Sequence, residues 1–285
     1  MGKKKKKNQL KSADFLLTII VIGLVIFGTI MVFSASYYSS ISETGDPYTY
    51  LRDNIKWTLL GGLPMLLTST VSYRVYRPLA PVFLVASILL LGLLFTPLGV
   101  VRNNAARWIG IGEFTLMPGE VAKICAILFT SWFLSKDPSR IKSFFRGVLP
   151  LLLLCGIYFG LIILQPNLST AITICAIIIG IMFVAGLNIG YLISFGALGS
   201  LGILGMVMMD EEGYWMKRLL SFTDPFQDPL GSGWQVIQSL LTLGSGGLIG
   251  VGLGKSIQKT LYLPEPQNDF IFSVIAEEMG LIGVT

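Results

Sequence analysis

The chain has 285 residues, of which 53% are hydrophobic and 13% are charged, with no histidine and a net charge of +5. A soluble globular domain typically carries about 25% charged residues, so this composition excludes an ordinary soluble protein and predicts an integral membrane protein. Apolar segments that cross a hydrocarbon core of about 30 Å must be helical, because no water is available there to satisfy an unpaired backbone.

Seven apolar segments of suitable length follow one another, and an eighth starts close to the end of the printed sequence. We therefore expect an all-α, polytopic membrane helix bundle with seven complete helices and the start of an eighth. The first segment is longer than the core of a signal peptide, about 7 to 15 residues, so we expect it to be retained. The expected spans are 15–36, 55–71, 79–97, 118–135, 148–164, 169–187 and 189–209, with the eighth beginning near Asp269.

Lysine and arginine are distributed unevenly between the two sides that these spans define. If the N-terminus is cytoplasmic, most of them lie inside, in agreement with the positive-inside rule. We expect residues 1–14 to be a basic cytoplasmic tail and 15–285 to be one transmembrane domain with a long outer loop at 210–268. The inner set is Lys3 to Lys7, Lys11, Arg74, Arg77, Lys136, Arg140, Lys142 and Arg146, and the outer set before the fourth helix is Arg52, Lys56, Arg102 and Arg107.

Several classes of function are excluded by what the sequence lacks. The polylysine start is interpreted as a topology anchor close to anionic lipid, and no nucleic acid is expected as a partner. Cys125, Cys155 and Cys175 all fall inside expected spans, where cysteine behaves as a small hydrophobe, and no disulfide or metal-ligand spacing is present. No Walker-type loop is present either, which argues against an ATP-driven pump. The substrate is expected to come from the membrane or the outer side.

The segment YLPEPQNDFIFSVIAEEMG places Asp269 where a proline-rich loop becomes an apolar helix, and this helix carries Glu277 and Glu278. A carboxylate at the centre of a membrane helix costs at least about 2.5 kcal/mol. We therefore expect a polar partner or a water-filled cavity at this helix. The residues alone leave two interpretations of Asp269 open: a catalytic base, or an N-cap worth about 1 kcal/mol.

A second segment, ARWIGIGEFTLMPGEVAK, begins an apolar helix at Pro118. Proline is tolerated in a first turn, Glu120 is favoured there by the helix dipole, and Lys123 lies three residues on, on the same face. This pair is open to a structural interpretation, in which it neutralises itself, and to a functional one. Arg107, which can bind phosphate in a bidentate manner, and Trp108, which suits the membrane interface, favour function.

Two further segments are rich in turn residues. In ILQPNLSTA, Pro166 and Asn167 form an outer turn after Gln165, and Ser169 or Thr170 is expected to cap the next helix. In the outer loop, residues 228–256 are expected to form an amphipathic or re-entrant stretch between glycine clusters, whose glycines permit positive φ and close backbone approach.

Together these segments resemble the SEDS family of bacterial membrane proteins, which includes FtsW, RodA and SpoVE. The resemblance is carried, in order, by RWIGIGEFTLMPGEVAK, QPNLSTA, DPLGSGWQVIQSL and YLPEPQNDFIFSVIAEEMGLIG. The YLPEP, AEEMG and DPLGSG segments are more similar to the FtsW and SpoVE branch than to RodA. The resemblance implies a bundle of ten helices, of which the printed chain would lack two and part of a third.

The resemblance also implies an activity. A similar protein would be a peptidoglycan glycosyltransferase that polymerises lipid II at the outer face of the bacterial cytoplasmic membrane, in cell division or a related process such as sporulation. Its expected partners are a class B penicillin-binding protein with transpeptidase activity and other membrane proteins of division or wall synthesis. No cofactor is implied, and assistance by a divalent cation such as Mg²⁺ is left open. Asp269 matches the essential acid of the family's PExxxDFIF motif, and the expected substrate-binding residues are Arg107, Trp108, Glu120, Lys123 and Gln165.

The sequence departs from the family pattern near these residues: MPGE stands for QPSE, QPNLST for QPDLGT and QND for HTD. Met117 and Gly119 thus replace glutamine and serine, and Asn167 replaces aspartate. Two other functions stay open. One is a lipid II flippase in which Glu120, Lys123 and Glu277 line a polar path, since a transporter also needs charges inside the membrane. The other is a non-catalytic scaffold of a division complex. Short, basic cytoplasmic connections favour the enzyme, because transport needs functional residues at both faces.

Overall fold

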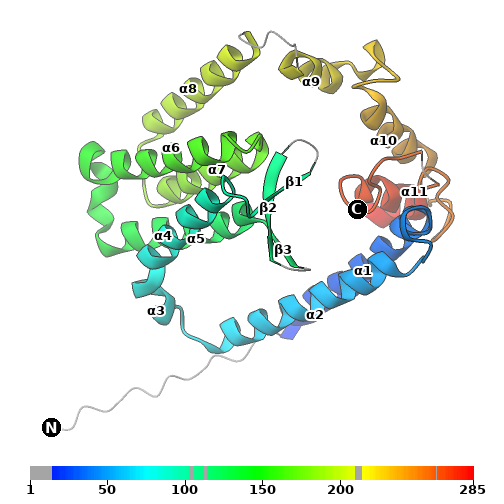
Figure 1. Cartoon of the computed structure of the whole chain (residues 1–285), viewed down its shortest axis with the longest axis horizontal. Helices are drawn as coiled ribbons and strands as arrows, with labels where there is room; N and C mark the ends of the chain where they lie inside the picture. Colours follow the sequence, from blue (N-terminus) through cyan, green and yellow to red (C-terminus); the bar gives the residue numbers. More distant parts are fainter. Residues whose placement is uncertain (1–14, 103–104, 112–113, 209–213, 261) are drawn as a thin grey trace. The chain divides into compact units, whose positions relative to one another are not determined.

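The computed structural model describes residues 15–102, 105–111, 114–208, 214–260 and 262–285 (Figure 1). The chain divides into two compact units, which are described separately below. The terminal unit joins Met1–Thr70 to Gly205–Thr285, and the middle unit is Val71–Leu204. The terminal unit thus combines the first expected helices with the segment that carries Asp269.

The terminal unit is built around two long helices from the start of the chain, α1 (Phe15–Thr44) and α2 (Thr49–Thr70), which pack side by side (Figure 1). They are followed by α9 (Tyr214–Thr223), the 3₁₀ turn η4 (Pro225–Gln227), α10 (Trp234–Ser245) and α11 (Ile271–Val284). Helix α11 contacts both α10 and α1. In its described residues, the expected outer loop therefore contains the helices α9 and α10, and α10 fits the amphipathic stretch predicted for its second half.

The middle unit begins with short turns, α3 (Tyr73–Tyr76) and η1 (Arg77–Leu79), that lead into α4 (Ala80–Leu93). After a small sheet come α5 (Pro118–Lys136), the turns η2 (Pro138–Lys142) and η3 (Phe144–Val148), then α6 (Leu149–Ile163), α7 (Leu168–Val184) and α8 (Ile189–Met208), whose last residues already belong to the terminal unit. Helix α5 packs against α4 and α7, and α6 packs against α7 (Figure 1).

The core of the middle unit is an apolar cluster drawn from α4, α5, α6 and α7. Alanines at 122 and 126, one helical turn apart, are fully buried and let α5 approach its neighbours closely. The buried Tyr158 hydroxyl lies 2.7 Å from the Ser87 hydroxyl. This bond satisfies the polar end of an otherwise apolar side chain, so the core joins α4 to α6 by packing and by one polar contact.

The predicted spans are confirmed as helices. The seven complete spans coincide with α1, α2, α4, α5, α6, α7 and α8, and the eighth coincides with α11. Within the described ranges, three helical segments are long and apolar enough to cross a membrane: Phe15–Thr44, Tyr73–Leu93 and Phe144–Ile163. Leu168–Val184 and Ile189–Gly202 are shorter apolar helices. The predicted all-α membrane bundle is therefore correct, while its description as one transmembrane domain stays a prediction.

A small antiparallel sheet in the middle unit is absent from the predicted architecture. Its strands are β1 (Gly99–Arg102), β2 (Ala105–Ile111) and β3 (Phe114–Leu116), in the order β1-β2-β3. Residues on a strand alternate between its two faces, and Ile109 on β2 is buried in the core. Residues 99–116 lie between two long apolar segments, so the sequence predicts only a connection between helices there. The three strands, of 4, 7 and 3 residues, are much shorter than a membrane-spanning helix.

Candidate functional site

Three of the predicted site segments meet within the middle unit. Arg107 on β2 donates a hydrogen bond from Nη2 to the carbonyl of Pro166, in the turn between α6 and α7. Gly119, in the first turn of α5, lies against the first turn of α7, because a Cβ at this position would be 3.1 Å from Thr170 Cγ2. These contacts bring the second strand, the start of α5 and the α6–α7 turn together. The predicted site residues on these segments are here called the middle cluster: Arg107, Trp108, Glu120, Lys123 and Gln165.

Glu120 and Lys123 form the ion pair that their spacing predicts. The Lys123 Nζ lies 2.8 Å from Glu120 Oε1 and 3.0 Å from Oε2. Both side chains remain accessible, with exposed fractions of 26% for Lys123 and 57% for Glu120. Because solvent screens it, such a pair contributes at most about 1 kcal/mol to stability. The two charges are consequently accessible to a polar substrate.

The α6–α7 turn is held by two amide side chains. Gln165 is buried and its Nε2 lies 3.5 Å from the carbonyl of Leu91, a long hydrogen bond toward α4. Asn167 is the N-cap of α7, and its Oδ1 accepts a hydrogen bond from the Thr170 backbone N–H at 3.3 Å. The prediction that Ser169 or Thr170 caps this helix is therefore wrong. Asparagine caps as well as aspartate does, so the family's aspartate is not needed for this role.

Arg107 and its neighbour Trp108 lie at an irregularity of the sheet, where the pairing of β2 with β1 shifts between Val100 and Val101. Trp108 is half-buried and pairs with Val100 of β1. The Nε of Arg107 is buried and finds no hydrogen-bond acceptor among the described residues. A buried N–H group without an acceptor destabilises the folded protein by about 1 to 3 kcal/mol. The guanidinium is therefore suited to donate hydrogen bonds to a second, anionic group.

Asp269 belongs to the terminal unit, where it follows a tight turn. The Asn268 backbone N–H donates to the Glu265 carbonyl at 3.1 Å, and the Asn268 side chain donates to the Glu265 carboxylate at 2.8 Å. Glu265 adopts a φ of +47°, in the left-handed region that few side chains occupy. The turn therefore has a defined, strained geometry directly before Asp269.

The side chain of Asp269 is exposed, and in the described part of the chain it makes no hydrogen bond or ion pair. Helix α11 begins at Ile271, its N-cap is Phe270, and no side chain caps it. The N-cap interpretation of Asp269 is therefore wrong. The carboxylate is left available for a ligand or a reacting group.

The loop that carries Asp269 is anchored by apolar contacts with α1 and α11. Leu263 is buried against Ala35 of α1 and Val274 of α11, and Phe270 and Ile271 pack against the same cluster. Asp269 thus lies beside a short hydrophobic anchor.

Tyr50 lies at the start of α2, outside the expected span, and is coupled to the same loop. Its hydroxyl donates to Glu43 Oε2 at 2.7 Å. This hydrogen bond, then burial and the negative charges of Glu43 and Glu265, raise the pKa of Tyr50 to about 12. Glu265, in the turn before Asp269, thus contributes to the electrostatic environment of Tyr50.

The two acids inside α11 are buried and fully partnered, as their position in an apolar helix requires. Glu278 accepts a 2.7 Å bond from Lys259 Nζ and bonds of 2.7 and 2.9 Å from the Ser34 hydroxyl. Glu277 accepts hydrogen bonds from the Ser256 hydroxyl and from the backbone N–H of Ile257, the latter at 3.1 Å. The predicted polar partner thus exists. Sequence analysis did not identify Lys259, although a buried acid needs a cation and residues 246–270 contain only two lysines.

The glycine-rich loop before Lys259 approaches α11 closely, as predicted. The backbone N–H groups of Val251 and Gly252 donate to the carbonyls of Glu277 and Glu278, both at 2.9 Å. Gly280 has a φ of +67° and interrupts the helix there, and a Cβ on Gly280 would collide with the backbone of Gly250. Glycine at both positions is therefore required by the contact itself.

Among the residues described, no group of three or more histidine, cysteine, aspartate or glutamate side chains could hold a metal ion. Cys125, Cys155 and Cys175 are free. The described ranges therefore contain no cluster of such side chains that would bind a divalent cation.

Comparison with known proteins agrees with this arrangement. The family model described as "Cell cycle protein", which covers FtsW, RodA and SpoVE, matches residues 14–285. Stage V sporulation protein E of Bacillus subtilis (strain 168) is 40% identical over 275 residues, which cover 96% of this chain and 75% of that protein. The probable peptidoglycan glycosyltransferase FtsW of Geobacter sp. (strain M18) is 35% identical over 272 residues, which cover 95% of this chain and 74% of that protein.

Solved structures show the same fold. A chain from a peptidoglycan synthase complex, studied for its coordination of polymerization and crosslinking, superimposes with a TM-score of 0.72 at 29% identity, covering 96% of this chain and 73% of that one. The rod shape determining protein RodA of Thermus thermophilus superimposes with a TM-score of 0.60 at 26% identity, covering 96% and 70%. This multi-pass membrane chain therefore belongs to the SEDS family of FtsW, RodA and SpoVE.

Proposed function

We propose that this protein is a peptidoglycan glycosyltransferase, which polymerises lipid II into glycan strands at the outer face of the cytoplasmic membrane, with its N-terminus in the cytoplasm. Relatives in the FtsW branch are named probable peptidoglycan glycosyltransferases. A structural neighbour belongs to a complex concerned with polymerization and crosslinking of peptidoglycan. Membership of this family supports a role in wall synthesis, and the site carries the more specific proposal.

The observation that carries it is the state of Asp269. A carboxylate that caps a helix or pairs with a cation has a structural role, but Asp269 is exposed and does neither within the described residues. It lies at the end of a strained turn and next to a buried apolar anchor. A free carboxylate on a fixed support is suited to accept a proton from a substrate hydroxyl.

The reaction follows from this role. A sugar hydroxyl attacks the anomeric carbon of a second sugar, and a new C–O bond forms as the bond to the lipid pyrophosphate breaks. The hydroxyl proton passes to Asp269, and the bonding electron pair leaves with the pyrophosphate. Such a base contributes about 10² to 10⁴-fold in rate, and a single direct displacement inverts the configuration at the anomeric carbon.

Lipid II carries a pyrophosphate, and the middle cluster of the middle unit offers positive charge of the kind that binds such a group. Arg107 has five N–H donors; one bonds the Pro166 carbonyl, and the Nε has no acceptor among the described residues. Lys123 is partly neutralised by Glu120, so its contribution is smaller. Trp108 contributes an aromatic surface at the membrane interface, and Gln165 orients the turn that holds Arg107.

The proposed partners are a class B penicillin-binding protein, which would cross-link the new strands, and other membrane proteins of wall synthesis. The similarity to a sporulation protein and to FtsW proteins supports a role in division or a related process such as sporulation.

The test is a lipid II polymerisation assay with the purified protein and its class B penicillin-binding protein in lipid nanodiscs. Asp269→Asn keeps the shape of the side chain and removes the base. Asp53→Asn is the matched control, because Asp53 is an exposed acid of the same unit that pairs only with Lys56 in the described structure. We expect polymer from the wild type and from Asp53→Asn, and a loss of at least about 100-fold in Asp269→Asn.

Two outcomes contradict the proposal. Equal polymer from wild type and Asp269→Asn would mean that the base lies elsewhere. No polymer from any preparation would contradict a glycosyltransferase and favour a lipid II flippase or a non-catalytic scaffold, which are then separated by measuring lipid II translocation in proteoliposomes.

A further inference from the structure

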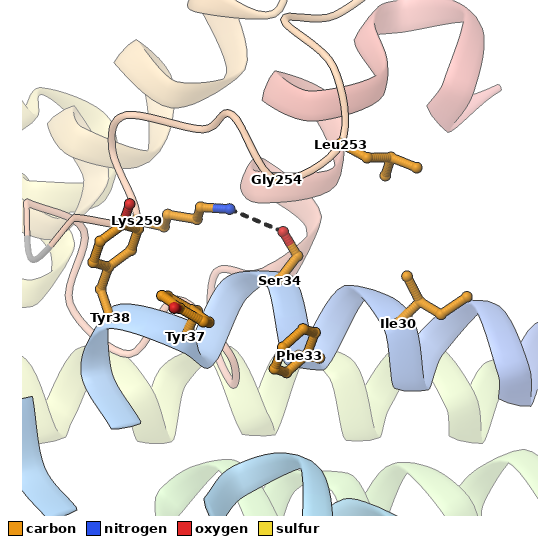
Figure 2. Close-up of a pocket in the computed structure, with 8 residues that line it drawn as sticks. All are labelled: Ile30, Phe33, Ser34, Tyr37, Tyr38, Leu253, Gly254 and Lys259. Carbon is orange, nitrogen blue, oxygen red and sulfur yellow. Dashed lines mark hydrogen bonds between the residues drawn. The ribbon is translucent and has the colours of Figure 1, made fainter. Parts of the chain in front are cut away.

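We infer that Lys259 is a positioning residue: its buried ion pair with Glu278 fixes the loop that ends in Asp269. This inference rests on the proposed function, because it assigns Lys259 a role only through Asp269. Figure 2 shows the Lys259 ammonium reaching Ser34 on α1, at the wall of a pocket whose other side chains are mostly apolar or aromatic.

The ion pair joins three segments that are distant in sequence. The Lys259 and Glu278 side chains are only 3% and 0% exposed, and Nζ lies 2.7 Å from Oε1. Ser34 completes the network, because its hydroxyl donates to Glu278 and accepts a 2.9 Å bond from Lys259. Helix α1, the outer loop and helix α11 are thus tied at one buried point.

Further hydrogen bonds hold the loop on both sides of Lys259. The backbone N–H of Lys259 donates to the Ser256 hydroxyl at 3.3 Å, and that hydroxyl donates to Glu277. The backbone N–H of Leu263 donates to the Gln258 carbonyl at 2.9 Å, which closes the next turn of the loop. Neighbouring acids of α11 therefore hold neighbouring parts of one loop, which continues through Leu263 to Asp269.

Lys259 lies at the edge of a pocket and is held there by directional bonds. A pocket of about 400 Å³ lies beside the ion pair, lined by Lys259 and Ser34 together with Ile30, Phe33, Tyr37, Tyr38, Leu253 and Gly254. The Lys259 side chain is itself only 3% exposed, and its Nζ is held by the bonds to Glu278 and Ser34. Buried ion pairs add little net stability compared with well-packed apolar residues, but their geometry is directional. That property suits a positioning role.

The decisive variant replaces both charges at once, Lys259→Met with Glu278→Met. No buried charge is then left unpaired, so the protein is expected to fold with a nearly unchanged unfolding midpoint. We expect the amides of residues 257–270 to exchange hydrogen about tenfold faster, because the loop opens locally more often. We also expect kcat for lipid II polymerisation to fall by about 10 to 100-fold, with KM changed less than about threefold, because substrate is still bound while the base is misplaced.

Lys255→Met is the matched control. Lys255 lies in the same loop, is exposed, and makes no side-chain hydrogen bond or ion pair with the described residues. Its replacement is expected to leave both the exchange rates and kcat at wild-type values. If Lys255→Met reproduces the effects of the double variant, general loss of loop charge explains them and the inference is wrong.

The two measurements separate this inference from the proposed function. Unchanged amide exchange in the double variant would overturn the inference whatever the protein catalyses. Faster exchange with unchanged kcat would also overturn it, because the loop would then move without consequence for Asp269. If Asp269→Asn polymerises as well as the wild type, the proposed function fails, and the positioning role of Lys259 toward a base fails with it.

Discussion

Two lysine–glutamate pairs, one in each unit, differ in burial and therefore in what they can do. In the middle unit, Lys123 and Glu120 lie one helical turn apart and stay accessible to solvent. In the terminal unit, Lys259 and Glu278 are 19 residues apart in sequence, almost fully buried, and joined by a third group, Ser34. The exposed pair can exchange its partners for a substrate, whereas the buried pair would leave a bare charge in the interior if either partner left. The same two residue types are thus suited to binding in one unit and to holding a loop in the other.

The largest effect on stability is expected when one partner of the buried pair is replaced. Lys259→Met removes the cation and leaves the buried Glu278 carboxyl with only the Ser34 hydroxyl as a side-chain partner among the described residues. We expect the free energy of unfolding to fall by about 3 to 5 kcal/mol, measured by denaturant titration in detergent micelles. Adding Glu278→Met should restore most of this loss. A single variant as stable as the wild type would show that water reaches Glu278 and that the pair is not truly buried.

A smaller loss of stability is expected from a substitution at Gly280, where the glycine-rich loop contacts α11. Gly280 has a φ of +67° and ψ of −174°, a conformation that is open to glycine almost alone. Gly280→Ala is expected to destabilise the protein by about 1 to 3 kcal/mol. Gly244→Ala is the control, because Gly244 is in the helix α10 and a Cβ there meets nothing within 4 Å. This control should be neutral or stabilising by up to about 1 kcal/mol, and equal destabilisation by both changes would contradict the close-contact argument.

The smallest effect on stability is expected at the exposed pair. Lys123→Met should change the free energy of unfolding by less than about 1 kcal/mol. If Lys123 helps to offset pyrophosphate charge, the same variant lowers kcat/KM for lipid II by about tenfold. If the Lys123→Met variant loses stability but keeps its kcat/KM, Lys123 has a structural role and does not bind the substrate.

Helices and the need for polar partners could be predicted from the sequence because both depend on local composition. The long apolar segments gave the spans, the spacing of Glu120 and Lys123 gave their pairing, and the acids of α11 required a partner. These inferences use only neighbours in the chain and the cost of charge in an apolar medium.

The identity of distant partners could not be predicted in the same way. Lys255 and Lys259 are equally plausible partners for Glu278 until the loop folds back, and only Lys259 is placed beside it. Likewise, Asn167 rather than Ser169 caps α7, and Phe270 rather than Asp269 occupies the cap of α11, because a shift of one or two residues in a helix start reassigns the cap. The strands at 99–116 form through pairing with each other, which single-segment patterns do not reveal.

The interruption of α11 at Gly280 has a consequence for how the protein is made. An unpaired carbonyl or a bare carboxylate inside the bilayer is unfavourable for an emerging helix. Chains are synthesised from the N-terminus, so α1 and the glycine-rich loop, with Ser34 and Lys259, leave the ribosome before Glu277 and Glu278. The N–H groups of Val251 and Gly252 and the ammonium of Lys259 are therefore already present when α11 arrives. Each of these partners of α11 therefore precedes it along the chain and is synthesised before the acid or carbonyl with which it pairs.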